Sequence, residues 1–283
     1  MKIAILGNGQ LGLELYEDLK NKYDVTLFSF PSFNICNNIQ LCDTIKNNDL
    51  IINCAANINV DKIENEDEID SYNVNYLAVK NLAIYCRYFE KQLVHISTDY
   101  VYGSNNYSDI LNEEYVCNPI NKYGQDKFCG ELAIRVEKLK SFLILRVSGV
   151  YGKYGVERRV NFIEKIKYGL KNNSEIKVVD DQIGNLTSTK LIIESINNFI
   201  ENKIPSGTYN LMNDGDVVSR FDIANFIKEC IKSNCNIVPC KTNEFKLPAE
   251  RQLNSNMSIE KIKQYMQIKH WKDAVKEYLE ETK

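Results

Sequence analysis

Short runs of apolar residues alternate with stretches of helical periodicity through the first two-thirds of the chain. Strands are predicted at residues 2–6, 25–28, 50–56, 93–97 and 142–147, and helices at residues 13–19 and 76–89. Strands that are apolar at every position are typical of a parallel sheet with helices on both faces. We therefore expect an α/β fold with a doubly wound, Rossmann-type parallel sheet. Ligands of such sheets bind at the edge where the strands end.

The pattern becomes less regular after about residue 150. Helices are predicted at residues 161–168, 191–200, 220–231, 259–265 and 271–279, and strands at residues 175–179 and 207–211. We expect residues 1–150 to form the main domain. Residues 151–283 are expected to form a smaller mixed α/β lobe, interleaved with the last elements of the sheet.

Composition restricts the classes of function. The 283 residues carry a formal net charge of −3, which argues against nucleic acid as the main partner. No run of eighteen apolar residues occurs, so no membrane span is expected. The first predicted strand begins at residue 2 without a signal sequence, and the nine cysteines form no Cys-x-x-Cys pair. We expect a cytoplasmic protein with reduced thiols and no metal site.

A glycine-rich turn follows the first predicted strand. It reads Gly7-Asn8-Gly9-Gln10-Leu11-Gly12 and leads directly into a helical pattern. A Gly-x-Gly-x-x-Gly turn between strand and helix is typical of dinucleotide binding, because the backbone approaches the pyrophosphate and the helix N-terminus favours its charge. Residues 1–150 are therefore predicted to bind a dinucleotide.

A tyrosine and a lysine provide the candidate chemistry. Tyr123 and Lys127 lie four residues apart in a predicted helix, which places both on one face. A cation next to a phenol favours the phenolate, so Tyr123 can exchange a proton with a carbonyl or an alcohol oxygen. Thr98, at the end of the strand at 93–97, can hold that oxygen. His95 lies inside the same apolar strand and is predicted to be a core residue.

These residues and several further blocks resemble the dTDP-4-dehydrorhamnose reductase family, within the extended short-chain dehydrogenase/reductase superfamily. The resemblance extends over nearly the whole chain. The matching blocks are Gly9–Gly12, Ile52–Ala56, Val60–Glu64, Asn73–Asn75, His95–Gly103, Tyr123 to Lys127 with Gly130-Glu131, Leu145–Gly152, Asp181 to Thr187, Gly207–Asn210, and Arg251 to Ser255.

The resemblance implies an NAD(P)H-dependent reductase of the C4 keto group of a nucleotide-diphosphate 4-keto-6-deoxyhexose. Tyr123 would protonate the oxygen, Lys127 would lower the pKa of the phenol and hold the nicotinamide ribose, and Thr98 would position the carbonyl. The implied cofactor-binding residues are Gly7, Asn8, Gly9, Gln10, Leu11, Gly12, Ser29, Asn34, Ile35, Cys54, Ala55, Ala56, Tyr123 and Lys127. The implied substrate-binding residues are Thr98, Asp99, Tyr100, Ser148, Gln182 and Arg251.

The chain departs from the family at positions that affect ligands. An acid at the end of the second strand would favour NAD, but Ser29 stands there, so NADPH is favoured and NADH stays open.

Some members of the family hold magnesium at a dimer contact through glutamates. Glu14 matches one of these, but Lys190 stands where a second would be expected, so we predict no metal. The resemblance leaves a homodimer open.

Other functions of the same fold stay open. A 4,6-dehydratase is disfavoured, because Tyr100 stands where that chemistry needs a glutamate after the aspartate. A non-catalytic regulatory subunit is one alternative. A reductase or epimerase that acts on a GDP-, CDP- or UDP-sugar is another.

Overall fold

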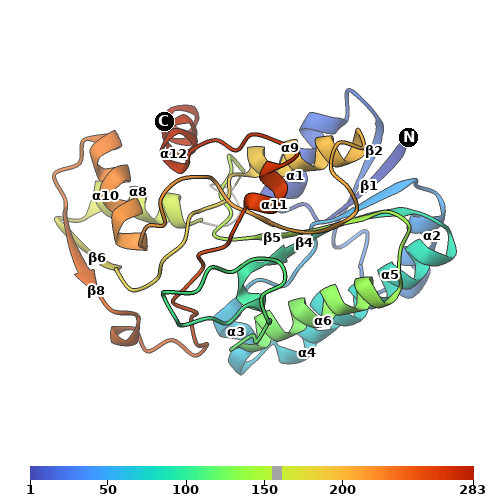
Figure 1. The fold of residues 1–283 in the computed structure, drawn as a ribbon, viewed down its shortest axis with the longest axis horizontal. Coiled ribbons are helices and arrows are strands. Elements are labelled where there is room, and N and C mark those ends of the chain that lie inside the picture. Colours follow the sequence, from blue (N-terminus) through green and yellow to red (C-terminus); the bar gives the residue numbers. More distant parts are fainter. Residues whose placement is uncertain (155–160) are drawn as a thin grey trace.

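A six-stranded parallel sheet forms the centre of the molecule (Figure 1). The structure is a computed structural model and describes residues 1–154 and 161–283. All neighbouring strands are parallel. The order is β2 (Asp24–Phe28), β1 (Lys2–Leu6), β3 (Leu50–Asn53), β4 (Gln92–Thr98), β5 (Phe142–Val147) and β7 (Gly207–Leu211). The strand order reverses between β1 and β3, and this crevice is where doubly wound folds bind ligands.

Helices cover both faces of the sheet. In Figure 1, α1 and α9 lie above the sheet and α2, α5 and α6 lie below it. These helices are α1 (Gln10–Leu19), α2 (Asn38–Lys46), α5 (Ala78–Tyr88), α6 (Lys122–Val136) and α9 (Thr189–Ile200). The short helices α3 (Val60–Asn65) and α4 (Glu68–Ser71) and a π-helical turn (Tyr72–Leu77) precede α5, and α11 (Glu260–Lys263) lies near β7.

The strands β1, β3, β4 and β5 each contribute to two hydrophobic cores, because successive side chains point to opposite faces. Ile3 and Ile5 of β1 pack on the α1 and α9 side, and Ala4 and Leu6 pack on the α2, α5 and α6 side. All four side chains are fully buried. The central strands are therefore buried on both faces, as predicted, whereas the edge strand β2 is only partly buried. The α/β, Rossmann-type fold is confirmed.

A smaller lobe lies at one end of the sheet, at the left of Figure 1. It comprises α8 (Phe162–Asn172), β6 (Glu175–Val179), α10 (Arg220–Ile231), β8 (Asn236–Cys240) and α12 (Trp271–Glu281). β6 and β8 form a separate two-stranded parallel sheet, and these elements share a third core. Because α9 and β7 return to the main sheet between β6 and α10, the lobe is interleaved with the sheet in sequence.

The element boundaries differ from the sequence pattern in a few places. The predicted strand at 50–56 ends at Asn53, and residues 54–56 form a loop. The segment at 259–265 is helical only over Glu260–Lys263. The pattern predicts neither α2 nor β8. Among the described residues, no helix has the length and apolar character needed to cross a bilayer.

Candidate functional site

A cavity of about 820 Å³ opens at the carboxyl ends of β1 to β5. It lies at the reversal of the strand order, and its volume suits a drug-sized or cofactor-sized ligand. The structure brings together all fourteen residues that the sequence assigns to the cofactor and all three catalytic candidates. Its lining includes Gly7, Asn8, Gly9, Gln10, Leu11, Gly12, Ser29, Asn34, Ile35, Cys54, Ala55, Ala56, Thr98, Asp99, Tyr100, Tyr123 and Lys127.

The glycine turn forms the floor of the cavity between β1 and α1. Gly7 has a φ of +100°, and a Cβ on it would lie 2.9 Å from the Ala55 amide nitrogen. A Cβ on Gly12 would lie 1.9 Å from the Gly7 carbonyl oxygen. A Cβ on Gly9, in contrast, would meet no protein atom within 4 Å. The fold therefore requires glycine at positions 7 and 12, whereas at Gly9 only a ligand would compete for the space.

Helix α1 directs its N-terminus at this floor. Its N-cap is Gly9, which has no side chain to accept from the amides of the first turn. The amides of the first turn are thus open to an anion, which the helix dipole also favours. The Gln10 side chain donates to the Val150 carbonyl oxygen at 3.1 Å and ties the turn to the far side of the cavity. These features fit the pyrophosphate of a dinucleotide.

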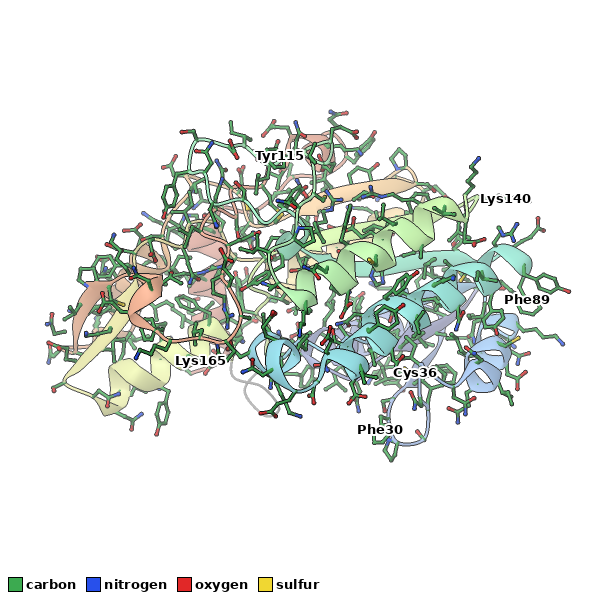
Figure 2. All side chains as sticks on the ribbon, turned by 90° about the horizontal axis from the view of Figure 1, so that it is seen from below. Phe30, Cys36, Phe89, Tyr115, Lys140 and Lys165 are labelled. Atoms are coloured by element: carbon green, nitrogen blue, oxygen red, sulfur yellow. The ribbon has the colours of Figure 1, made fainter. Side chains whose placement is uncertain are left out.

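The loop after β2 forms the distal end of the cavity. Ser29, Phe30 and Asn34 line it, and Figure 2 shows Phe30 at the outer tip of this loop, where its ring is 77% exposed. The Asn34 side-chain oxygen accepts from the Cys36 amide at 3.0 Å. Ser29 stands at the end of β2 without a carboxylate that would repel a 2′-phosphate, which is consistent with NADPH.

Thr98 ends β4 and begins a single 3-10 turn (Asp99–Val101). Its hydroxyl accepts from the Tyr100 amide at 3.2 Å and donates to Asp99 Oδ1 at 3.0 Å. Asp99 is buried, and its second oxygen accepts from the Ser255 hydroxyl at 2.7 Å. This network fixes the position of the Thr98 oxygen next to Tyr123.

Tyr123 lies in the first turn of α6, whose N-cap Asn121 accepts from the Gly124 amide at 2.9 Å. The Tyr123 ring packs edge-to-face on Tyr100, with centroids 5.8 Å apart. Burial raises the pKa of the Tyr123 phenol, and the hydrogen bond with Thr98 partly opposes this. Asp99 and Tyr100 raise the pKa further. In this structure the phenol is therefore a protonated, proton-donating group.

Lys127 follows Tyr123 by one turn of α6 and is almost fully buried. Its ammonium nitrogen donates to the Ile96 carbonyl oxygen at 2.7 Å and lies 3.3 Å from His95 Nε2. Burial lowers the pKa of Lys127 to about 8. His95 is in the core, as predicted, but its contact with Lys127 could not be read from the sequence.

Three predicted substrate residues lie outside the cavity lining. Ser148 is fully buried behind it, and its backbone bonds to Thr187. Gln182 points to the smaller lobe, where it donates to the Thr242 hydroxyl at 3.0 Å. Arg251 pairs with Asp61 at 2.6 Å, and its charge acts on the Tyr100 phenol. The structure brings Arg251 near the cavity but keeps Gln182 away from it.

Arg220, at the start of α10, is a candidate that sequence reasoning missed. Its charge interacts with Asp99 and Tyr100, and burial lowers its pKa. Its guanidinium lies 5.5 Å from the Phe162 ring and makes a long, 3.4 Å bond to the Gly184 carbonyl oxygen. Within the described residues it has no carboxylate ion pair. The sequence placed Arg220 only at the start of a predicted helix, because the contact with Tyr100 depends on tertiary structure.

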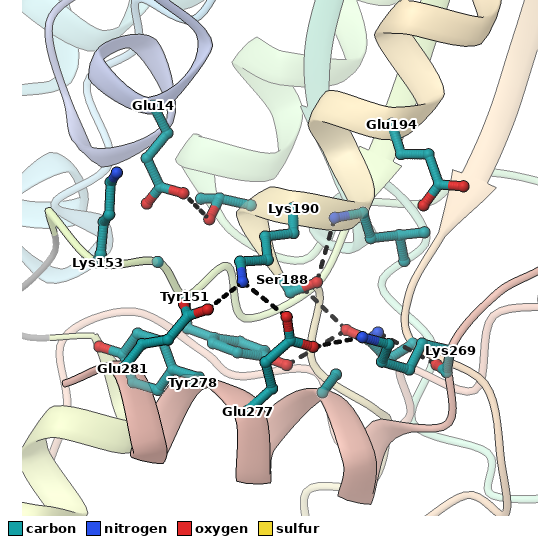
Figure 3. A pocket seen from close by; sticks show the side chains of 15 residues that line it. Glu14, Tyr151, Lys153, Ser188, Lys190, Glu194, Lys269, Glu277, Tyr278 and Glu281 are labelled. Carbon is teal, nitrogen blue, oxygen red and sulfur yellow. Dashed lines mark hydrogen bonds and ion pairs between the residues drawn. The ribbon is translucent and has the colours of Figure 1, made fainter. Parts of the chain in front are cut away.

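A second, smaller cavity lies between α1, α9 and α12, and Figure 3 shows its side chains. Glu14 accepts from the Thr189 hydroxyl at 2.6 Å. The Lys190 ammonium bridges Glu277, at 2.7 Å, and Glu281, and Lys269 also contacts Glu277. Ammonium groups thus already pair with Glu277 and Glu281, and burial raises the pKa of Glu14. Two lysines beside a carboxyl group whose burial disfavours its charge do not fit the magnesium that the resemblance implies for some members.

Comparisons with known proteins agree with this geometry. A family model described as RmlD substrate binding domain matches residues 1–283. The chain is 31% identical to the spore coat polysaccharide biosynthesis protein SpsK of Bacillus subtilis over 285 residues. That alignment covers 99% of this chain and 97% of SpsK.

Solved structures show the same fold at similar identity. A dTDP-4-dehydrorhamnose reductase from Clostridium acetobutylicum matches with a TM-score of 0.91 and 31% identity, and 99% of each chain is covered. The dTDP-4-dehydrorhamnose reductase of Bacillus anthracis, solved in complex with NADP, matches with a TM-score of 0.90 and 32% identity. That match also covers 99% of each chain.

Proposed function

The chain belongs to the RmlD substrate binding domain family, and we propose that it reduces the C4 keto group of a nucleotide-diphosphate 4-keto-6-deoxyhexose, as dTDP-4-dehydrorhamnose reductases do. The protein is an NAD(P)-dependent oxidoreductase of sugar nucleotides. The observation that carries the specific proposal is that Thr98, Tyr123 and Lys127 line the same cavity as the glycine turn. A proton donor and a dinucleotide-binding turn thus line one cavity.

The dinucleotide fits the residues of the cavity. The turn at Gly7, Gly9 and Gly12 and the open N-terminus of α1 would hold the pyrophosphate, and Ser29, Asn34 and Ile35 would contact the adenosine end. Cys54, Ala55 and Ala56 would lie along the middle of the cofactor. NADPH is the favoured cofactor, and NADH is an alternative. When bound, the cofactor supplies a hydride to the carbonyl carbon.

The side chains supply the proton. Tyr123 transfers its phenolic proton to the oxygen that becomes the alcohol, and it is later reprotonated from solvent. Thr98, held by Asp99 and the Tyr100 amide, orients that oxygen. Arg220 and Arg251, whose charges both act on the Tyr100 phenol, would suit the diphosphate of the sugar nucleotide. Residues 151–283 would thus form the substrate-binding lobe.

We also propose that the protein acts in the cytoplasm, as a homodimer, to supply a deoxysugar for polysaccharide biosynthesis. The resemblance to reductases of this pathway supports all three. Sedimentation of the purified protein would test the dimer.

The direct test is turnover with a panel of dTDP-, GDP-, CDP- and UDP-linked 4-keto-6-deoxy sugars, measured as loss of NADPH absorbance without a partner protein. We expect oxidation of NADPH with at least one of them, the dTDP-linked sugar first. If every substrate fails while the protein binds another enzyme tightly, the alternative of a regulatory subunit is correct.

A further inference from the structure

His95 connects the sheet to Lys127. It lies on β4, fully buried, opposite Asn53 in the register of β3. Asn53 Nδ2 lies 3.1 Å from His95 Nδ1, and Lys127 Nζ lies 3.3 Å from His95 Nε2. The imidazole therefore bridges a strand residue and the lysine of α6. A ring flip would break both contacts, so the pair of contacts fixes the orientation of the ring.

The backbone determines which way the Asn53 amide points. The Ala55 amide donates to Asn53 Oδ1 at 3.1 Å, so the NH₂ group of Asn53 must be the part that faces His95. An NH₂ group only donates, so His95 Nδ1 must accept. Burial and the nearby Lys127 charge lower the pKa of His95 well below its usual range, so the ring is neutral. A neutral imidazole that accepts at Nδ1 carries its proton on Nε2.

The Nε2 proton then points at Lys127. An ammonium has three donors and no acceptor, so it cannot accept this proton in a hydrogen bond. A neutral amine can, because it has a lone pair, while one of its N–H groups still donates to the Ile96 carbonyl. We propose that Asn53 and His95 are positioning residues that favour the uncharged amine of Lys127 and thereby set the pH at which this side chain gains its charge.

The other titratable groups around Lys127 do not favour its uncharged form in the same way. Glu131, one turn further along α6, favours the charged form, but it is engaged by Arg146 at 2.7 Å and by the Ser97 hydroxyl. Burial raises the pKa of the Cys54 thiol to about 12, so that group is neutral. Tyr123, one turn before Lys127, is protonated in this structure. Burial lowers the pKa of Lys127 to about 8 and so favours the uncharged amine, as the hydrogen bonds of His95 do.

The functional consequence rests on the proposed reductase activity. If the charged form of Lys127 holds the cofactor ribose and stabilises the Tyr123 phenolate, activity is lost as the pH rises through the pKa of Lys127. Because this pKa lies below the ordinary value for lysine, the loss falls near pH ~8 rather than ~10. Burial is the main cause of this low pKa, and Asn53 and His95 would help to keep the alkaline limit of the enzyme close to physiological pH.

The tautomer can be measured without any activity. The chain has two histidines, His95 and the exposed His270, so long-range ¹⁵N NMR of the full-length labelled protein gives two ring patterns, assigned by the variant His270→Gln. We expect His95 to be the neutral Nε2–H tautomer from about pH 6 to about pH 8. An imidazolium or an Nδ1–H tautomer at His95 would overturn the proposal.

The variant Asn53→Asp tests the proposal by enzyme activity. A carboxylate can still accept from the Ala55 amide, and it would also accept from His95 Nδ1–H, which switches the tautomer and lets Nε2 accept from the Lys127 ammonium. We expect the switch in the NMR spectrum and an upward shift of the alkaline limb of kcat/KM by ~1 pH unit or more. A shift of the limb without a change of tautomer would be a charge effect and would overturn the proposal. Inactivity on all sugars would refute the proposed function but leave the tautomer result standing.

Discussion

At the scale of single residues, the phenol of Tyr123 is the group on which the proposed chemistry depends. Tyr123→Phe keeps the packing on Tyr100 and removes only the transferable proton. General acid catalysis contributes ~10²–10⁴-fold, so turnover should fall by about that factor while NADPH affinity changes little. The matched control is Tyr88→Phe, which removes the hydroxyl of an exposed tyrosine outside the cavity lining and should leave the turnover unchanged. Steady-state kinetics and calorimetry would measure both, and near-normal turnover of Tyr123→Phe would exclude this residue as the acid.

Thr98 and Lys127 should give graded effects. Thr98→Val loses the bonds to Asp99 and to the Tyr100 amide, so it should reduce turnover less than Tyr123→Phe because the proton donor remains. Lys127→Met should reduce both turnover and NADPH affinity, since Lys127 is predicted to contact the cofactor ribose as well. A variant Lys127→Met with normal cofactor affinity would remove the ribose contact from the proposal.

Residue-level reasoning from sequence predicted a common location for residues that are neighbours both in sequence and in space. The glycine turn, Thr98-Asp99-Tyr100 and Tyr123 to Lys127 each lie within one strand–turn or helical unit, and all of these residues line the cavity. Asn53, His95 and Arg220 were missed, because their importance depends on contacts between β3, β4, α6 and α10. Gln182 was assigned to the substrate by resemblance, whereas its side chain bonds to Thr242.

At the scale of elements, the turn between β1 and α1 contains one glycine that the fold requires, Gly12, and one that we expect only the cofactor to require, Gly9. Gly9→Val should leave the fold intact, because a Cβ at Gly9 meets no protein atom. It should greatly weaken NADPH binding, because the new side chain occupies the space of the pyrophosphate. Gly12→Val is the matched contrast and should destabilise the protein itself, since its Cβ would lie 1.9 Å from the Gly7 carbonyl oxygen. Unchanged NADPH affinity in folded Gly9→Val, measured by calorimetry, would contradict the cofactor assignment.

The helix that carries Tyr123 and Lys127 is anchored by a buried ion pair. Arg146 of β5 and Glu131 of α6 are both fully buried, and Glu131 also accepts from the Ser97 hydroxyl of β4. Arg146→Met leaves a buried carboxylate without its main partner and should cost ~3–5 kcal/mol of stability in urea unfolding. Arg135→Met removes the half-exposed partner of the same glutamate and should cost ~1 kcal/mol or less. Equal losses would mean that Arg146 does not have this anchoring role.

The elements that the sequence pattern missed have identifiable causes. β8 contains Pro239, which removes a backbone donor. The proline is tolerated because, in the part of the chain that the structure describes, β8 pairs with β6 alone and its other edge is unpaired. Helix α2 begins at the cap Asn37, which accepts from the Ile39 and Gln40 amides. That capping signal lies in a polar stretch without a strong apolar stripe. The strand predicted at 50–56 is longer than β3. Cys54, Ala55 and Ala56 are small and apolar, as in a buried strand, but they line the cavity rather than the core.

At the scale of the whole molecule, we predict that the contact between α9 and α12 needs no metal. Lys190 bridges Glu277 and Glu281, so an internal ammonium stands among carboxylates that would otherwise repel each other. Wild-type protein should therefore show the same Tm and the same sedimentation in Mg²⁺ and in EDTA. Lys190→Glu removes the ammonium and adds a carboxylate, so Mg²⁺ should raise the Tm of this variant and EDTA should lower it. A wild-type protein that loses stability or changes its oligomeric state in EDTA would show that the prediction of no metal is wrong.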